Sequence, residues 1–135
     1  MVLITDLLEK PGNLSTASKY TVWNGLLYLG TGALFIVWPG VVQTIFMDAA
    51  FVGHEGALFR AIGLTLAVIG WLYVFGGRSG ARGAVAASVI DRLLFVPVVL
   101  VPLVIAGVFP HVLLTLAILD PLLAIGAWVL LGRRT

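Results

Sequence analysis

Four apolar stretches occupy most of this chain of 135 residues, and each is long enough to cross a lipid bilayer. A transmembrane helix needs about 20 residues, because it rises about 1.5 Å per residue through a hydrocarbon core about 30 Å thick. Pro-Gly and Gly-Gly pairs and basic residues separate the stretches. We therefore expect four transmembrane helices, over residues 20–38, 56–75, 83–108 and 112–131.

The composition argues against a water-soluble domain. Hydrophobic residues make up 61% of the chain and charged residues only 10%, which leaves too little polar surface to cover a soluble fold. The length accommodates four spans and no separate soluble domain, so we expect one all-α membrane domain over residues 1–135. The absence of cysteine excludes disulfides and thiolate metal sites. The net charge of +2 indicates no nucleic-acid-binding surface.

The basic residues outside the spans predict the orientation. They would all lie on one side of a four-span protein, and they are Lys10, Lys19, Arg78, Arg82, Arg133 and Arg134. The loops on the opposite side contain Asp48, His54, Glu55 and His111, without Lys or Arg. Because Lys and Arg concentrate in cytoplasmic loops, we expect an antiparallel four-helix bundle with both termini in the cytoplasm.

Two segments outside the spans are apolar enough to lie at the membrane surface. Residues 41–53 are expected to form a loop or a short interfacial helix. Residues 1–12 lack the basic start and the long apolar stretch of a secretory signal. They are expected to form either a short amphipathic helix on the cytoplasmic surface or a frayed tail.

Four charged residues lie inside the apolar stretches: Arg60, Asp91, Arg92 and Asp120. Their formal charges sum to zero. A charged side chain in the hydrocarbon core costs at least about 2.5–3.5 kcal/mol, so such residues normally face the interior of a bundle and find partners there. They are therefore the candidate functional residues of this chain.

Depth and helical phase predict which of these residues meet. At the rise of an α-helix, Asp91 lies roughly 13 Å from Arg82, and Asp120 lies roughly 20 Å from Arg133. Both residues are therefore expected near the middle of the membrane. Arg60 lies nearer the outer surface, and its long side chain can reach toward Asp120 or back to that surface. Asp91 and Arg92 point about 100° apart, so at least one of them needs a partner on another helix. Asn24 and Tyr28 of the first span are the expected polar neighbours.

Small residues share the predicted helix faces with the charges, and small residues allow membrane helices to approach closely. The stripes are Arg60, Gly63, Ala67 and Gly70 in the second span; Ala84, Ala87, Ser88 and Asp91 in the third; and Ala117, Asp120, Ala124 and Ala127 in the fourth. In the third span, Pro97 and Pro102 predict a kink or local unwinding.

The sequence is compatible with three interpretations of the polar cluster. It holds the helices together, it binds a ligand or substrate, or it conducts protons or ions. His54 and His111 offer two imidazoles without a third ligand, so we predict no metal site. No phosphate-binding loop, zinc-protease motif or nucleophile elbow is present.

Short runs in the second and fourth spans carry a family resemblance. They are Phe59-Arg60-Ala61-Ile62-Gly63, Gly70-Trp71-Leu72-Tyr73 and Ile118-Leu119-Asp120-Pro121. Together they resemble the DoxX-like group of small bacterial four-helix membrane proteins. The resemblance implies a four-helix bundle in the bacterial inner membrane and a recurrent arginine at the start of the second span. Some members of that group are linked to quinone or thiosulfate oxidation, and the absence of cysteine gives no support to a thiol-based role here.

These observations favour a binding or accessory protein that packs against itself, as a homo-oligomer, or within a larger membrane assembly. The alternative is a membrane enzyme or carrier for a quinone, a sterol-like lipid or an isoprenoid. In that alternative Asp91 or Asp120 acts as acid or base, and Arg60 or Arg92 orients the polar head. We predict no resident cofactor, and a bound quinone or lipid is compatible with either hypothesis.

Overall fold

The computed structural model describes residues 2–9 and 11–133, and within them all regular secondary structure is helical. Four helical segments are long and apolar enough to cross a membrane, which confirms the predicted number of spans. They are α2 (Thr16–Val37), α4 (Glu55–Arg78), the composite segment Arg82–Ile105, and α7 (Pro110–Gly132). The chain is therefore a multi-pass membrane protein.

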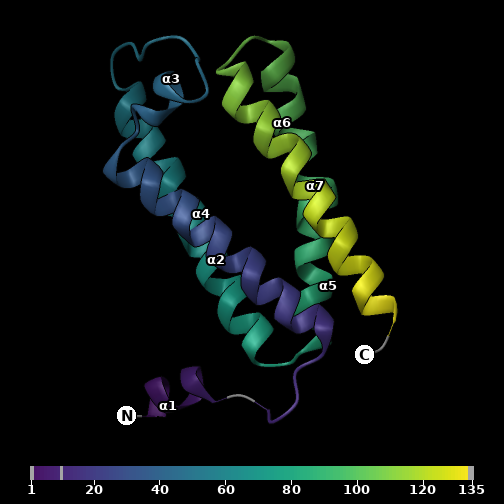
Figure 1. The fold of residues 1–135 in the computed structure, drawn as a ribbon. Helices are drawn as coiled ribbons and strands as arrows, with labels where there is room; N and C mark the ends of the chain where they lie inside the picture. Colours follow the sequence, from purple (N-terminus) through teal and green to yellow (C-terminus); the bar gives the residue numbers. More distant parts are fainter. Residues whose placement is uncertain (1, 10, 134–135) are drawn as a thin grey trace.

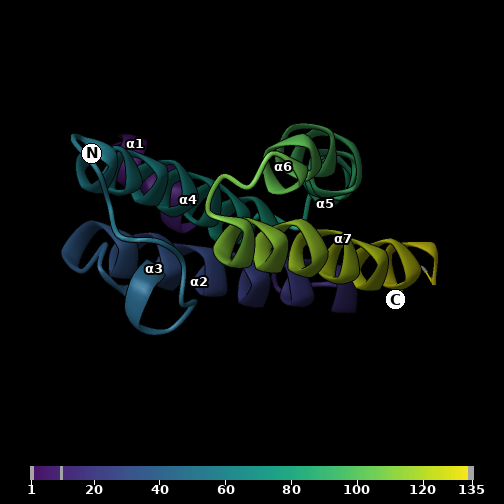
Figure 2. The ribbon, with the colours of Figure 1, turned by 90° about the horizontal axis from the view of Figure 1, so that it is seen from above.

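The long helices form two pairs (Figures 1 and 2). One pair is α2 with α4, and the other is the composite segment with α7. The pairs converge at the end that carries α1 (Val2–Leu8) and the turn between α4 and the composite segment, called here the N-terminal end (Figure 1). They diverge toward the α3 end, which carries α3 (Val41–Thr44) and the turn before α7.

The two segments that were expected to lie at the membrane surface both contain helix. The N-terminal segment forms α1, so the helical alternative is confirmed over Val2–Leu8, and the guanidinium of Arg78 donates to the carbonyl of Leu8 at 3.3 Å. Residues 41–53 begin with the short helix α3 and continue as a loop. Two of the basic residues that predicted the orientation, Lys10 and Arg134, lie outside the described residues.

Glycines hold α2 and α4 in close contact. A Cβ added to Gly25 would lie 2.6 Å from the backbone nitrogen of Val74 and 2.7 Å from the carbonyl oxygen of Gly70. One added to Gly32 would overlap the backbone of Gly63 and Ala67. Side chains at these positions would push the helices apart, so the pair depends on glycine, as close membrane helix pairs commonly do.

The third span is a composite of three segments: α5 (Arg82–Ile90), the π-helix η1 (Asp91–Phe95) and α6 (Val96–Ile105). Pro97 has no backbone N–H to donate to the preceding turn, and its ring crowds that turn. The helix accommodates this by widening to a π-helical turn that ends at Phe95, two residues before Pro97. The predicted distortion is thus confirmed, and it falls on the two residues that carry charge, Asp91 and Arg92.

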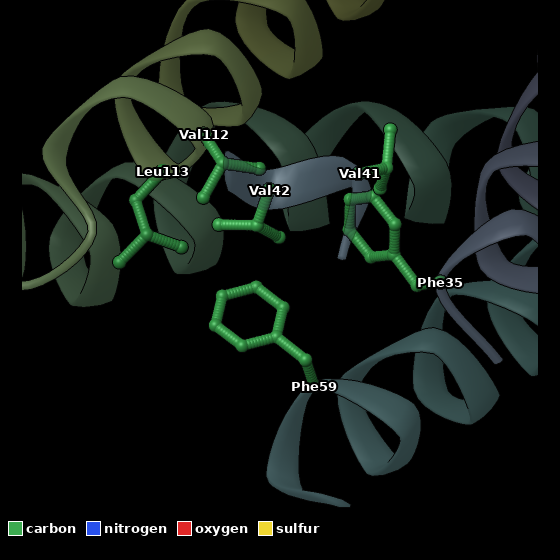
Figure 3. Close-up of a cluster of buried hydrophobic side chains, with 6 residues drawn as sticks. All are labelled: Phe35, Val41, Val42, Phe59, Val112 and Leu113. Atoms are coloured by element: carbon green, nitrogen blue, oxygen red, sulfur yellow. The ribbon is translucent and has the colours of Figure 1, made fainter. Parts of the chain in front are cut away.

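The α3 end is closed by an apolar core. Side chains from α2, α3, α4 and α7 meet there (Figure 3), and the buried ones are Phe35, Val41, Val42, Phe59, Val112 and Leu113. Phe109, just before α7, has a left-handed backbone with φ of 41°. This conformation is strained for a residue with a side chain. The ring of Phe109 packs edge-on against Phe59, with centroids 4.9 Å apart, and this contact holds the strained turn in place.

A carboxylate ties the two helix pairs together at the α3 end. Asp48 is buried in the loop after α3, and its two side-chain oxygens accept the backbone N–H groups of His111 and Val112, each at 2.9 Å. These donors belong to the first turn of α7, where the helix dipole also favours a negative charge. The ring of His111 contacts the carbonyl oxygen of Phe46 at 2.7 Å, which fastens the same loop a second time.

The small-residue stripes were expected to be buried, and the structure confirms this for some helices but not for others. In α7, Ala117, Asp120, Ala124 and Ala127 are all buried, as expected. In α5 and η1 the expected stripe is wrong, because Ala87 is exposed and the buried face comprises Val85, Ser88, Val89 and Arg92. Valines 85 and 89 instead join a core with α2 and α7 at the N-terminal end. Lipid chains are as apolar as valine side chains, so a valine can face either the lipid or another helix. Residue polarity alone therefore does not identify the buried face.

Candidate intramembrane binding site

Four polar side chains from α2, η1 and α7 are buried near the middle of the molecule. They are called here the polar quartet: Asn24, Tyr28, Arg92 and Asp120, which are only 4%, 2%, 1% and 6% exposed. All four were predicted from the sequence. Asn24 lies one helical turn from Tyr28 on α2, and the Tyr28 hydroxyl lies close to both Arg92 and Asp120. The structure thus brings these four predicted residues together.

Each member of the quartet has a polar atom without a hydrogen-bond partner in the described part of the chain. These atoms are Asn24 Nδ2, Tyr28 Oη, Arg92 Nη1 and Asp120 Oδ1. Tyr28 lies near Arg92 and Asp120 without reaching hydrogen-bond geometry with either. Buried polar groups are normally paired, and leaving one unpaired costs about 1–3 kcal/mol. The quartet therefore offers three donors and a carboxylate acceptor to a polar partner.

Arg92 is held in place by its own helix and by two tyrosines. Its Nε donates to the Ser88 carbonyl at 3.1 Å and its Nη2 to the Ser88 hydroxyl at 3.2 Å. The guanidinium lies over the ring of Tyr73, 5.1 Å from the centroid, and over that of Tyr28 at 5.8 Å. A desolvated cation–π contact is worth about 2 kcal/mol, so the rings offset part of the cost of burying this charge.

Asp91 finds its partner on another helix. The hydroxyl of Tyr73 on α4 donates to Asp91 Oδ2 at 2.6 Å, a short hydrogen bond to a carboxylate. The sequence predicted that Asp91 or Arg92 needs a partner on another helix, and this bond supplies it. Tyr73 also packs edge-on against Tyr28, with centroids 5.6 Å apart, so the Asp91 pair and the quartet are contiguous.

Arg60 does not join the cluster, and its expected place there is corrected. It is exposed on α4, and within residues 2–9 and 11–133 no hydrogen bond or ion pair to it is found. The buried stripe of α4 runs through Phe59, Gly63, Gly70 and Gly77, with Arg60 beside it. The predicted neutrality therefore fails: Asp91, Arg92 and Asp120 together carry a formal charge of −1.

A cavity of about 540 Å³ reaches this buried charge. It lies between α4 and the η1–α6 segment, with α7 as its third wall, and its lining is almost entirely apolar. Asp120 lines it near the middle of α7, while Glu55 lies at the beginning of α4. Three lining residues, Leu58, Phe95 and Val99, are 61%, 64% and 59% exposed, so the cavity opens on the side of the molecule. In a bilayer that side faces the lipid chains.

Two residues of this region were not predicted as site residues. Tyr73 was noted only within a short run of the second span, and Ser88 only as a member of a small-residue stripe. A signal for Tyr73 exists, because a tyrosine inside an apolar span needs a partner for its hydroxyl. Ser88 precedes Arg92 by one helical turn, a spacing that places both on one helix face. Neither signal identifies the partner helix.

Comparison with known proteins found no matching family model, no matching curated protein and no matching solved structure. The DoxX-like resemblance therefore remains a prediction that rests on the three short runs quoted above.

Proposed function

We propose that this chain is an intramembrane binding protein for an amphipathic, quinone- or lipid-like molecule. The apolar part of that molecule occupies the cavity between α4 and α6, and its polar head reaches Asp120. The strongest support is that one residue, Asp120, both lines a cavity and has an unpaired polar atom. Asp120 lines a cavity of about 540 Å³, within the range of about 300–1,000 Å³ typical of ligand pockets, and it has an unpaired, buried oxygen.

The proposal places the chain as an antiparallel four-helix bundle in the bacterial inner membrane. The N-terminal end, which carries Lys19, Arg78 and Arg82, faces the cytoplasm under the positive-inside rule. The α3 end faces the opposite side. The cavity then opens into the bilayer, so a lipid-soluble molecule enters it without crossing water. Association with itself or with a larger membrane assembly belongs to the same proposal, since a small binding subunit presents its ligand to a partner.

An enzyme or carrier that acts on the same molecule is the second candidate function. In that case Asp120 is the group that exchanges a proton, because it lines the cavity and has an unpaired oxygen, whereas Asp91 is engaged by Tyr73. Arg92 stays in the role of a fixed charge beside it, held by Ser88. Chemical turnover of a bound molecule would favour this candidate over simple binding.

Blocking the cavity tests the proposal directly. Thr65 lines the cavity and is exposed, so Thr65→Trp places an indole in the cavity without entering a packed core. We expect it to lower labelling by a diazirine-bearing dodecanol at least about tenfold, equivalent to about 1.4 kcal/mol of binding. Photo-crosslinking of the purified protein in detergent, with mapping of the labelled peptides, measures this.

The control is Leu64→Trp, one residue away on the same helix, which faces outward at 59% exposure and does not line the cavity. It should leave labelling of α4, α6 and α7 peptides unchanged. Equal labelling of both variants, or labelling spread evenly over all exposed helix faces, would sink the proposal.

A further inference from the structure

The polar groups that line the cavity are acidic or neutral. They are Asp120, Glu55 and Thr65, and none of the described residues lining the cavity is basic. Glu55 is already engaged, because its Oε1 accepts the backbone N–H of Val52 at 2.6 Å. Asp120 Oδ1 is a buried acceptor with no donor in the described chain. Asp120 is the one quartet residue that lines the cavity, so a head group that reaches it is best matched by a hydrogen-bond donor.

The charge balance around Asp120 further restricts which chemical classes of head group can bind there. The region contains two carboxyl groups, Asp91 and Asp120, and one guanidinium, Arg92, while Arg60 is outside the cluster. An uncompensated charge in a low-dielectric interior is costly, and a positive charge brought to the site removes that cost. A carboxylate or phosphate head would instead add a second negative charge to the wall. Among the molecules that the proposed function allows, a quinone head offers only carbonyl acceptors and therefore matches a carboxylate less well than a head group with a donor does.

We propose that the cavity selects amphiphiles with a protonated amine head. The ammonium group donates to the Asp120 carboxylate and balances the formal charge of −1, and the alkyl or aryl body lies along the apolar walls of α4 and α6. This inference rests on the proposed function and specifies its ligand class.

Three probes with the same chain and different heads test this inference: dodecylamine, dodecanol and dodecanoate. Each competes with the diazirine-bearing dodecanol for photo-crosslinking to the full chain in a neutral detergent. We expect dodecylamine to displace the label at a concentration at least about tenfold lower than dodecanol does. Dodecanoate should be the weakest competitor. In Asp120→Asn the amine should lose its advantage over the alcohol.

Glu55→Gln is the matched control, because Glu55 is the other carboxylate of the lining and its amide replacement keeps an acceptor for Val52. It should preserve the preference for the amine. If Asp120→Asn does not fold, as judged by circular dichroism, the ranking of the three probes on the wild type still tests the preference for an amine head.

Three results would overturn the inference. Equal competition by amine and alcohol in the wild type would show that a proton, rather than a cationic ligand, balances the charge. Loss of the preference in Glu55→Gln but not in Asp120→Asn would show that the head group binds at Glu55 instead of Asp120. Specific crosslinking that none of the probes displaces, or no specific crosslinking at all, would overturn the proposed function as well, and so separates the two failures.

Discussion

Replacing Arg92 by Met should lower the free energy of unfolding by about 3–5 kcal/mol, the usual cost of removing one partner from a buried set of charges. Arg92 is only 1% exposed, its positive charge acts on the Asp120 carboxyl group, and it lies over the ring of Tyr73, the hydrogen-bond partner of Asp91. Without it, the Asp120 carboxyl group remains buried in an apolar interior, beside the half-buried Asp91. Reversible unfolding in sodium dodecyl sulfate, followed by tryptophan fluorescence and circular dichroism, measures the change.

Arg60→Met is the matched control, because it removes the same side chain from an exposed position of another span. We expect it to destabilise the protein by no more than about 0.5 kcal/mol, as for other exposed substitutions. Adding Asp120→Asn to Arg92→Met should recover part of the loss, since it removes one of the stranded carboxylates. Similar effects of the two arginine substitutions would mean that Arg92 does not compensate the buried carboxyl group of Asp120.

Gly32→Ala should destabilise the protein by about 1–3 kcal/mol, the typical cost of overpacking a close contact. The new methyl group would meet the backbone of Gly63 and Ala67 on α4, and a backbone cannot turn aside as a flexible side chain can. The same unfolding titration measures this loss. We also expect a weaker α2–α4 contact, seen as faster proteolysis between these helices.

The chain supplies a control two residues away. Gly30 is exposed and has open space around its Cβ position, so Gly30→Ala changes helix propensity without a clash. It should leave stability unchanged or raise it slightly. An equal loss of stability in both variants would contradict the close packing of α2 on α4.

Hydropathy and basic residues predicted the four spans because the bilayer imposes length and composition on any helix that crosses it. The quartet was predictable for a related reason: buried polar groups in lipid must seek one another. Arg60 shows the limit of that reasoning. A long side chain on the edge of a stripe reaches solvent or head groups as readily as the bundle interior, so phase and depth did not decide its place.

The features that sequence reasoning missed depend on tertiary neighbours. Tyr73 meets Asp91 from another helix, and Asp48 caps α7 across 63 residues of chain. Gly25 and Gly32 of the first span went unrecognised because the polar face of that helix drew attention to Asn24 and Tyr28. Their role becomes evident only when the glycines of α4 lie opposite them. The cavity could not be predicted at all, since it arises from the divergence of the two helix pairs.

The central claim is that Asp120 belongs to a binding site and does not only hold the helices together. Native mass spectrometry of Asp120→Asn, beside wild type and Asp91→Asn, tests it most directly. Asp91 contacts Tyr73 and does not line the cavity, so replacing this half-buried residue is the control for loss of a carboxylate within the spans. We predict that the wild type and Asp91→Asn retain an amphiphile from the membrane, whereas Asp120→Asn stays folded and retains none. Retention by all three proteins, or an Asp120→Asn variant that unfolds while no amphiphile is found on the wild type, would contradict the claim.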